Sequence, residues 1–417
     1  MPISDDYRQR LYPHLSKITE TFGTPFHIYD EIGIRQTTKR IFNIFSDFNF
    51  KEYYAVKALP NPHILTILRE EGCGFDCSSI PELILAHAIG ASGDDIMFTS
   101  NNTSRHEFEL ALAKGSAIIN LDDVHFLDVL STLPDLISFR VNFGTDMGNT
   151  IIGKPTEAKF GIPQERIVKA YRQAKQRGII RFGLHTMVVS NECDYQVHLQ
   201  SVERLCQIAI QLKSELGITL EFINIGGGLG IPYHPDETPL DLDAFGSGIH
   251  QLWQKHNLQD VALKMESGRY VTAPHGVLVT KIINRKESYR TCLGVDANMS
   301  ALMRPAMYGA YHHIDVVSRS VSALTEVVDV VGALCENNDK FAIQRELPKS
   351  TVGDLIIIHD TGAHGHAMGF NYNGRLRPQE LLLRADGTVE RIRRAETLED
   401  YFATLKFDAL TLSTDAK

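Results

Sequence analysis

The sequence predicts a (β/α)8 barrel followed by a second, all-β domain. Between about residues 30 and 270, short β-rich runs alternate with longer amphipathic stretches, and about eight such units form the signature of a closed barrel. After about residue 275, β-branched runs separated by Gly, Asn and Asp turns replace this alternation. The length of 417 residues also favours more than one domain. A doubly wound open sheet is the alternative for the first part, although eight similar units favour closure.

Each expected barrel strand is a short run dominated by β-branched, aromatic or other apolar residues. In order, the runs are EYYAVKA (52–58), GCGFDCSS (72–79), DIMFTS (95–100), AIINLD (117–122), LISFRVN (136–142), RFGLHTMVV (181–189), EFINIGGG (221–228) and VALKMES (261–267). The stretches between them, such as residues 60–71 and 194–216, repeat apolar residues every three or four positions. This spacing predicts helices with one buried face.

The second domain is expected to be a sandwich or a small Greek-key-type β-barrel. Its strand candidates lie at 275–287, 291–297, 313–318, 323–334, 351–360 and 380–394. The early run TPFHIYD (24–30) is an isolated strand candidate, and we expect it to pair with this domain. The predicted division is therefore 30–272 for the barrel, with 1–29 and 273–417 forming the second domain.

Composition excludes several classes of function. The chain is 43% hydrophobic and 22% charged, as in ordinary globular proteins. A net charge of −9 without any basic run argues against a nucleic-acid partner. No apolar run is long enough to span a bilayer, and the acidic N-terminus lacks the apolar core of a secretory signal. We therefore expect a cytoplasmic protein without a membrane partner. The six cysteines suggest neither a disulfide framework nor a metal site.

Lys57 interrupts the apolar run EYYAVKA near its carboxyl end. In a barrel this is the end at which the βα loops gather and chemistry takes place. A desolvated lysine can form a Schiff base with a carbonyl group. A lysine that extends to water from the strand end explains the residue equally well. Lys57 alone therefore does not distinguish a reactive amine from a surface lysine.

Three further segments carry candidate groups. The glycine-rich turn NIGGGLGI (224–231) could bring backbone N–H groups to a phosphate, but it lacks the dinucleotide-binding spacing and also suits a tight connector. MESGRY (265–270) places a carboxylate and a guanidinium at another strand end, where a local ion pair is the alternative. In ALCENND (333–339) a thiol could donate a proton, or it could be an ordinary loop cysteine.

The motifs together resemble the fold-type III pyridoxal-phosphate-dependent decarboxylases, and among them the diaminopimelate decarboxylases most closely. The resemblance covers nearly the whole chain, with the motifs in the family's order. They are FGTPFHIYD, YYAVKA, GFDCSSIPEL, FTSNNTS, KFGI, NIGGGLG, ESGRY, DANMSALMRPAMYGAYH, LCENND, NYNGRLRPQELLL and RIRRAETLEDYFA. The family's fold is a (β/α)8 barrel followed by a β-barrel domain, in agreement with the pattern above.

The resemblance implies pyridoxal 5′-phosphate as the cofactor and assigns roles. Lys57 would hold the cofactor aldehyde, Glu266 would pair with the pyridine nitrogen, and Cys335 would donate a proton in the neighbouring subunit's site, which implies a homodimer. The other residues implied to contact the cofactor are Asp76, Met187, Ser190, Gly226, Gly227, Gly228, Arg269, His364 and Tyr372. The two histidines at the end of DANMSALMRPAMYGAYHH (296–313) could suggest a metal site, but no third ligand has a suitable spacing, so no metal is expected.

The substrate is an amino acid by the same resemblance. Arg304 and Tyr308, with Arg269, suit a distal carboxylate, and Glu336 could hold a distal amino group, with Tyr372 lining the site. Together they indicate meso-2,6-diaminopimelate as substrate and L-lysine as product, and hence lysine biosynthesis.

Three departures from the family pattern lie around the cofactor. Met187 stands where a histidine normally stacks on the pyridine ring, Ser267 where proline is usual, and His364 where tyrosine normally meets the phosphate. They favour a divergent branch, so decarboxylation of D-ornithine, D-lysine or a carboxylated siderophore or polyamine intermediate is the alternative. A non-catalytic binding homologue would be expected to lack Lys57 or Cys335, and Glu266 disfavours a racemase.

Overall fold

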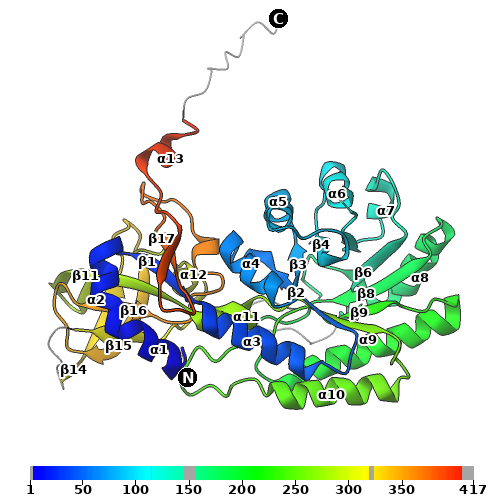
Figure 1. Cartoon of the computed structure of the whole chain (residues 1–417), viewed down its shortest axis with the longest axis horizontal. Coiled ribbons are helices and arrows are strands. Elements are labelled where there is room, and N and C mark those ends of the chain that lie inside the picture. Colours follow the sequence, from blue (N-terminus) through cyan, green and yellow to red (C-terminus); the bar gives the residue numbers. More distant parts are fainter. Residues whose placement is uncertain (1–2, 114, 145–153, 155, 319–323, 406–417) are drawn as a thin grey trace, which may run out of the picture.

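The computed structural model describes residues 3–113, 115–144, 154, 156–318 and 324–405. Its first unit is a closed barrel of eight parallel strands (Figure 1). Around the barrel these are β2 (Phe50–Ala55), β3 (Gly74–Cys77), β4 (Ile96–Ser100), β5 (Ile118–Leu121), β6 (Leu136–Asn142), β8 (Arg181–Thr186), β9 (Phe222–Asn224) and β10 (Ala262–Met265). β10 pairs with β2 and thereby closes the ring, and the two-residue β7 (Ile162–Pro163) attaches to β6. Each of the eight predicted barrel runs overlaps one of these strands.

Helices surround the barrel because each buries one apolar face against the outward side of the strands. They are α3 (Glu31–Ile44), α4 (Pro62–Glu70), α5 (Ile80–Ala88), α6 (Arg105–Leu112), α7 (Phe126–Val129), α8 (Gln164–Gln176), α9 (Tyr195–Leu216) and α10 (Leu242–Lys255). Polar side chains cap several of these helices at their first turn, for example Asp30 at α3 and Asn61 at α4. Tyr53, Met97, Ile118 and Phe222 form a separate small apolar cluster of barrel-strand residues.

The second unit is a nine-stranded mixed sheet. Its strands are β1 (Phe26–Asp30), β11 (Gly276–Glu287), β12 (Thr291–Val295), β13 (Ile314–Val317), β14 (Thr325–Val331), β15 (Lys340–Pro348), β16 (Leu355–Ile358), β17 (Gln379–Leu383) and β18 (Val389–Arg393). β1 pairs antiparallel with β11 and parallel with β17, so the early strand lies in the middle of this sheet. The predicted combination of a barrel with a β-rich second unit is confirmed.

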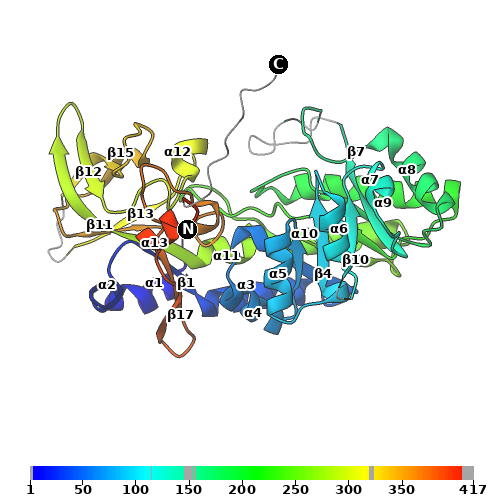
Figure 2. The same ribbon diagram turned by 90° about the horizontal axis from the view of Figure 1, so that it is seen from above.

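Short helices complete the second unit. The N-terminal α1 (Asp5–Leu11) and α2 (Leu15–Phe22) pack onto one face of the sheet through buried residues that include Tyr7, Leu11 and Leu15. The remaining short helices are α11 (Arg269–Thr272), α12 (Arg304–Tyr308) and α13 (Leu398–Phe402). In both views α11 lies between the barrel and the second sheet (Figures 1 and 2).

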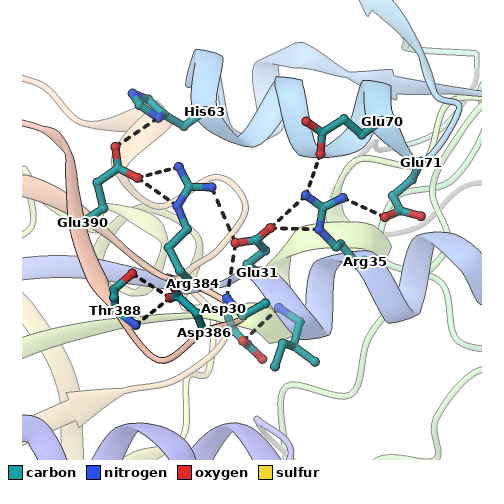
Figure 3. A network of polar contacts seen from close by, with 12 residues as sticks. Asp30, Glu31, Arg35, His63, Glu70, Glu71, Arg384, Asp386, Thr388 and Glu390 are labelled. Carbon is teal, nitrogen blue, oxygen red and sulfur yellow. Dashed lines mark hydrogen bonds and ion pairs between the residues drawn. The ribbon is translucent and has the colours of Figure 1, made fainter.

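A network of ion pairs joins the two units at their boundary (Figure 3). Arg384, directly after β17, contacts Glu31 at the start of α3 and Glu390 on β18. Glu390 in turn lies 3.6 Å from the ring of His63 on α4. The β17–β18 hairpin is thus tied to the first two helices of the barrel.

Candidate active site

Lys57 lies just beyond the carboxyl end of β2, in the one-turn 3-10 helix Val56–Ala58. Its neighbours Val56 and Ala58 are buried, but its own side chain is 56% exposed. The Lys57 Nζ atom is 3.8 Å from Oδ2 of Asp76, the third residue of β3. The apolar strand therefore holds a lysine whose amine reaches the mouth of the barrel.

Asp76 is buried, and its Oδ1 atom has no hydrogen-bond partner among the described residues. Burial and the negative charge of Glu266 raise the pKa of the Asp76 carboxyl well above its usual range, against the opposing effect of Lys57. A buried polar atom without a partner is costly. Asp76 is therefore suited to bind a further group at this point.

Glu266 follows β10 and is only 8% exposed. Its Oε2 atom is 3.1 Å from Nε2 of His185 on β8, and its Oε1 atom accepts a 2.8 Å hydrogen bond from the Asn224 amide on β9. Burial favours the neutral acid, but His185 and Asn224 outweigh it and lower the pKa of Glu266. The barrel mouth thus contains an ionised carboxylate held by two neighbouring strands.

The glycine turn after β9 is packed so closely that side chains would not fit. A Cβ atom at Gly226 would overlap the carbonyl oxygen of Thr186, and one at Gly227 would overlap that of Glu266. Gly226 also has a φ of +74°, a conformation that favours glycine. The N–H of Gly227 points to the sulfur of Met187, 3.3 Å away.

The segment after β8 runs beside this glycine turn. The N–H of Glu192 donates to the carbonyl oxygen of Gly228 at 2.9 Å, and the partly buried Ser190 lies in the same segment. The structure therefore places Met187, Ser190 and the three glycines in adjoining loops at one end of the barrel.

Arg269 and Arg304 converge on Tyr233. Arg269 Nη1 donates to the Tyr233 hydroxyl at 2.7 Å, and the Arg304 guanidinium carbon lies 4.4 Å from the centre of the Tyr233 ring. Arg304 is 6% exposed, and its Nη1 atom is 2.9 Å from Nε2 of His312. Within the described ranges, neither arginine forms an ion pair with a carboxylate.

His364 lies within electrostatic range of both arginines and of Lys57. The backbone N–H of His364 donates to the carbonyl oxygen of Ala58, the residue after Lys57, at 2.9 Å. Burial, together with the positive charges of Arg269, Arg304 and Lys57, lowers the pKa of the His364 imidazole well below its usual value. A neutral imidazole thus lies among three cationic side chains.

Four predicted residues are not joined to this group. Cys335 is exposed, and its N–H donates to the side chain of Asn373 at 2.6 Å, beside the 45% exposed Tyr372. Tyr308 is 62% exposed at the end of α12. For Cys335, Glu336, Tyr308 and Tyr372, no hydrogen bond or ion pair to Lys57 or Glu266 occurs in the described part of one chain.

Sequence reasoning missed the residues that support Glu266. His185 and Asn224 contact its carboxylate, and Arg140 on β6 donates to the Met187 carbonyl oxygen at 3.2 Å. The available signal was a polar residue near the carboxyl end of an otherwise apolar strand. The parallel pairing of β8 with β9 and of β9 with β10 brings His185, Asn224 and Glu266 together.

These groups fit pyridoxal phosphate, the cofactor that the sequence resemblance implies. An accessible amine, an ionised buried carboxylate and a glycine turn without room for side chains are the groups that its aldehyde, pyridine nitrogen and phosphate require. Among the residues that the structure describes, Oδ1 of Asp76 and Nδ1 of His185 are buried without a hydrogen-bond partner. In the described ranges no group of three potential metal ligands occurs, and no helix is long and apolar enough to cross a membrane.

Comparison with known proteins adds independent evidence. Residues 33–273 match the family model of the pyridoxal-dependent decarboxylase, pyridoxal binding domain. The chain is 49% identical over 411 residues to protein TabA of Pseudomonas amygdali pv. tabaci, covering 98% of this chain and 97% of that protein. It is 38% identical over 395 residues to the diaminopimelate decarboxylase of Methanothermobacter thermautotrophicus, covering 92% of each.

A solved structure agrees with these sequence relationships. The diaminopimelate decarboxylase of Helicobacter pylori, complexed with L-lysine, superposes with a TM-score of 0.87 at 30% identity. The match covers 93% of this chain and 98% of that one.

Proposed function

Since the chain belongs to the pyridoxal-dependent decarboxylases, we propose that this enzyme converts meso-2,6-diaminopimelate to L-lysine and CO2. That it is a pyridoxal-phosphate-dependent amino-acid decarboxylase follows from the family. The identity of the amino acid and the roles of individual residues are the proposal.

The observation that carries this choice of substrate is the pair Arg269 and Arg304. Both side chains meet at Tyr233, and Arg304 is buried without a carboxylate partner among the described residues. A buried guanidinium without an opposing charge is costly. A substrate with a carboxylate at its far end would supply that charge, as would the cofactor phosphate for the other arginine.

We assign the cofactor contacts to the residues gathered at the barrel mouth. Lys57 would hold the cofactor through its amine, with Asp76 beside it, and Glu266 would keep a proton on the pyridine nitrogen. The residues that would hold the phosphate and the ring are Met187, Ser190, Gly226, Gly227, Gly228, Arg269, His364 and Tyr372. When bound, pyridoxal phosphate accepts the electron pair that the departing CO2 leaves behind.

The remaining roles require a second copy of the chain. We propose a homodimer in which Cys335 of one subunit donates a proton at the site of the other, with Glu336 holding the distal amino group and Tyr308 lining the pocket. The exposure of Cys335, and the absence of a hydrogen bond or ion pair from it to Lys57 among the described residues, support this arrangement. A thiol can donate and regain a proton near neutral pH.

The proposed domain division follows the same assignment. Residues 30–272 would form the cofactor-binding barrel, and 1–29 with 273–417 the second domain. The extent of the family match and the pairing of β1 with β11 support it. The proposed enzyme is cytoplasmic and acts in lysine biosynthesis.

A second candidate is decarboxylation of a related amino acid, such as D-ornithine, D-lysine or a carboxylated siderophore or polyamine intermediate. The observation that favours it is the thioether of Met187 at the glycine turn, where it receives the Gly227 N–H. A thioether can pack against the cofactor ring, but it cannot supply the contribution that an imidazole at this position makes to the electronics of the ring or to the orientation of the substrate.

A substrate panel decides between the candidates. We expect the purified enzyme with pyridoxal phosphate to release CO2 from meso-diaminopimelate, and to do so faster than from either enantiomer of lysine or ornithine. Arg304→Met should raise KM for diaminopimelate about tenfold or more, because a charged hydrogen bond is lost. Release of CO2 from D-ornithine but none from meso-diaminopimelate would exclude the proposed substrate.

A further inference from the structure

The residues that follow Lys57 are bound to the second domain. The carbonyl oxygen of Ala58 accepts the N–H of His364 at 2.9 Å. The carbonyl oxygen of Pro60 accepts Nη2 of Arg393, at the end of β18, at 3.1 Å. Two bonds from the second domain therefore reach the backbone within three residues of the lysine.

A third bond involves a side chain. The amide nitrogen of Asn61 donates to Oε2 of Glu380 on β17 at 3.1 Å, and it lies 3.4 Å from the carbonyl oxygen of Ile392. The amide oxygen of Asn61 caps α4 by accepting the N–H of His63 at 3.1 Å. One buried side chain thus links the first turn of α4 to the second sheet.

Glu380 is the centre of these contacts. It is 1% exposed, accepts the hydroxyl of Tyr29 at 2.6 Å and forms an ion pair with Nε of Arg393. Burial opposes ionisation, but the neighbouring His366 and Arg393 lower the pKa of Glu380 to about 2. The same Arg393 therefore bonds both the buried carboxylate and the Pro60 carbonyl.

We propose that the Glu380–Arg393 pair positions Lys57 for attachment of the cofactor by holding residues 58–61 against the second sheet. The inference rests on the proposed role of Lys57 as the cofactor-binding lysine. Arg393 acts through the Pro60 backbone and Glu380 through the Asn61 side chain, since neither contacts Lys57 directly in the described contacts. They lie in the motifs QELLL and RIRRAETLEDYFA, for which the site otherwise gives no role.

The same hairpin also offers a matched control. Glu390, on β18, lies 3.6 Å from the ring of His63 on α4 and also pairs with Arg384 (Figure 3), and the Glu390 and His63 side chains are 41% and 39% exposed. Glu390→Gln breaks a contact between the same two elements without touching residues 58–61. An exposed pair of this kind contributes little to stability.

The test is the rate at which pyridoxal phosphate attaches to the cofactor-free full chain, followed by absorbance at saturating cofactor. Arg393→Lys keeps the positive charge beside Glu380 but loses the fork that also reaches Pro60. We expect attachment to slow about tenfold, the factor for one hydrogen bond to a charged group. Arg393→Gln should slow it at least as much, and Glu390→Gln should leave it unchanged.

A second control separates positioning from general destabilisation. Arg285→Gln removes the ion pair with Glu326 in the second sheet and should lower the melting temperature, yet attach cofactor at the wild-type rate. The proposal is overturned if Arg393→Lys and Arg393→Gln attach cofactor at the wild-type rate. It is equally overturned if Arg285→Gln slows attachment in proportion to its loss of stability.

Borohydride reduction followed by peptide mass spectrometry distinguishes this proposal from the proposed function. The reagent fixes the cofactor on the amine to which it is bound. If the wild-type label lies on a lysine other than Lys57, the proposed function fails. If the label lies on Lys57 and all variants attach equally fast, only the positioning role fails.

Discussion

Ser267 contributes a single backbone N–H that changes the environment of a neighbouring carboxyl group. The members of the resembled family usually have proline there, which has no N–H. In this chain the Ser267 N–H donates to Oε1 of Glu52, while Oε2 of Glu52 is buried without a partner among the described residues. Burial, with the charge of Glu266 adding to it, raises the pKa of Glu52 to about 8, although the Ser267 bond acts in the opposite direction.

This raised pKa makes the stability of the fold dependent on pH. In the folded chain Glu52 keeps a proton up to about pH 8, whereas in the unfolded chain it loses the proton near its ordinary pKa of about 4.3. Folding therefore takes up a proton between these values, and the contribution of Glu52 to stability falls as pH rises through them. Glu52→Gln should flatten this fall, as measured by the urea midpoint at pH 5, 6, 7 and 8.

The control for this experiment is an exposed glutamate. Glu20 lies at the surface of α2, so that Glu20→Gln should retain the wild-type dependence on pH. An unaltered dependence in Glu52→Gln would show that Glu52 is ionised in the folded protein.

At the scale of elements, the glycine turn after β9 depends on close packing. A Cβ atom at Gly227 would overlap the carbonyl oxygen of Glu266, so Gly227→Ala should displace the Glu266 carboxylate, which we propose pairs with the cofactor. We expect at least about a tenfold loss of affinity for pyridoxal phosphate, since a small misplacement at a charged hydrogen bond has this effect. An absorbance titration measures it.

Gly217, which ends α9, is the matched control. Its φ of +62° also disfavours alanine, but no atom lies within 4 Å of an added Cβ. Gly217→Ala should lower stability by about 1 kcal/mol and leave affinity for the cofactor unaltered. Wild-type affinity in Gly227→Ala would contradict the role assigned to the turn.

The barrel elements are predictable from sequence because their periodicity is local. Each of the eight runs overlaps its strand, and the residues at strand ends, such as Lys57 and Glu266, could be identified there. His185 and Asn224 could not, because a polar residue within an apolar strand equally suits a structural role. Their importance depends on which strands become neighbours, and this is decided by contacts between distant segments.

At the scale of the whole molecule, the proposed homodimer makes two subunits necessary for one site. Lys57→Ala should be inactive, and Cys335→Ala should bind cofactor normally but turn over slowly. Mixed and reassociated, the two variants should form hybrids with one intact site each, which restores about a quarter of wild-type activity in a random mixture. Decarboxylation assays before and after mixing measure this recovery.

The outcome depends only on where Cys335 acts. If the cysteine serves its own chain, every hybrid site lacks one of the two groups, and mixing restores nothing. Size-exclusion chromatography of each variant checks that dimers are present.

The central place of β1 in the second sheet has a consequence for synthesis of the protein on the ribosome. β1 emerges first, but its partners β11 and β17 follow about 250 and 350 residues later, a delay on the order of tens of seconds at 5–20 residues per second. The barrel strands are complete before β11 appears, so they can assemble while β1 is still without its sheet. During synthesis the barrel can therefore fold first, and the second sheet forms later, when β11 and β17 pair with the N-terminal strand β1.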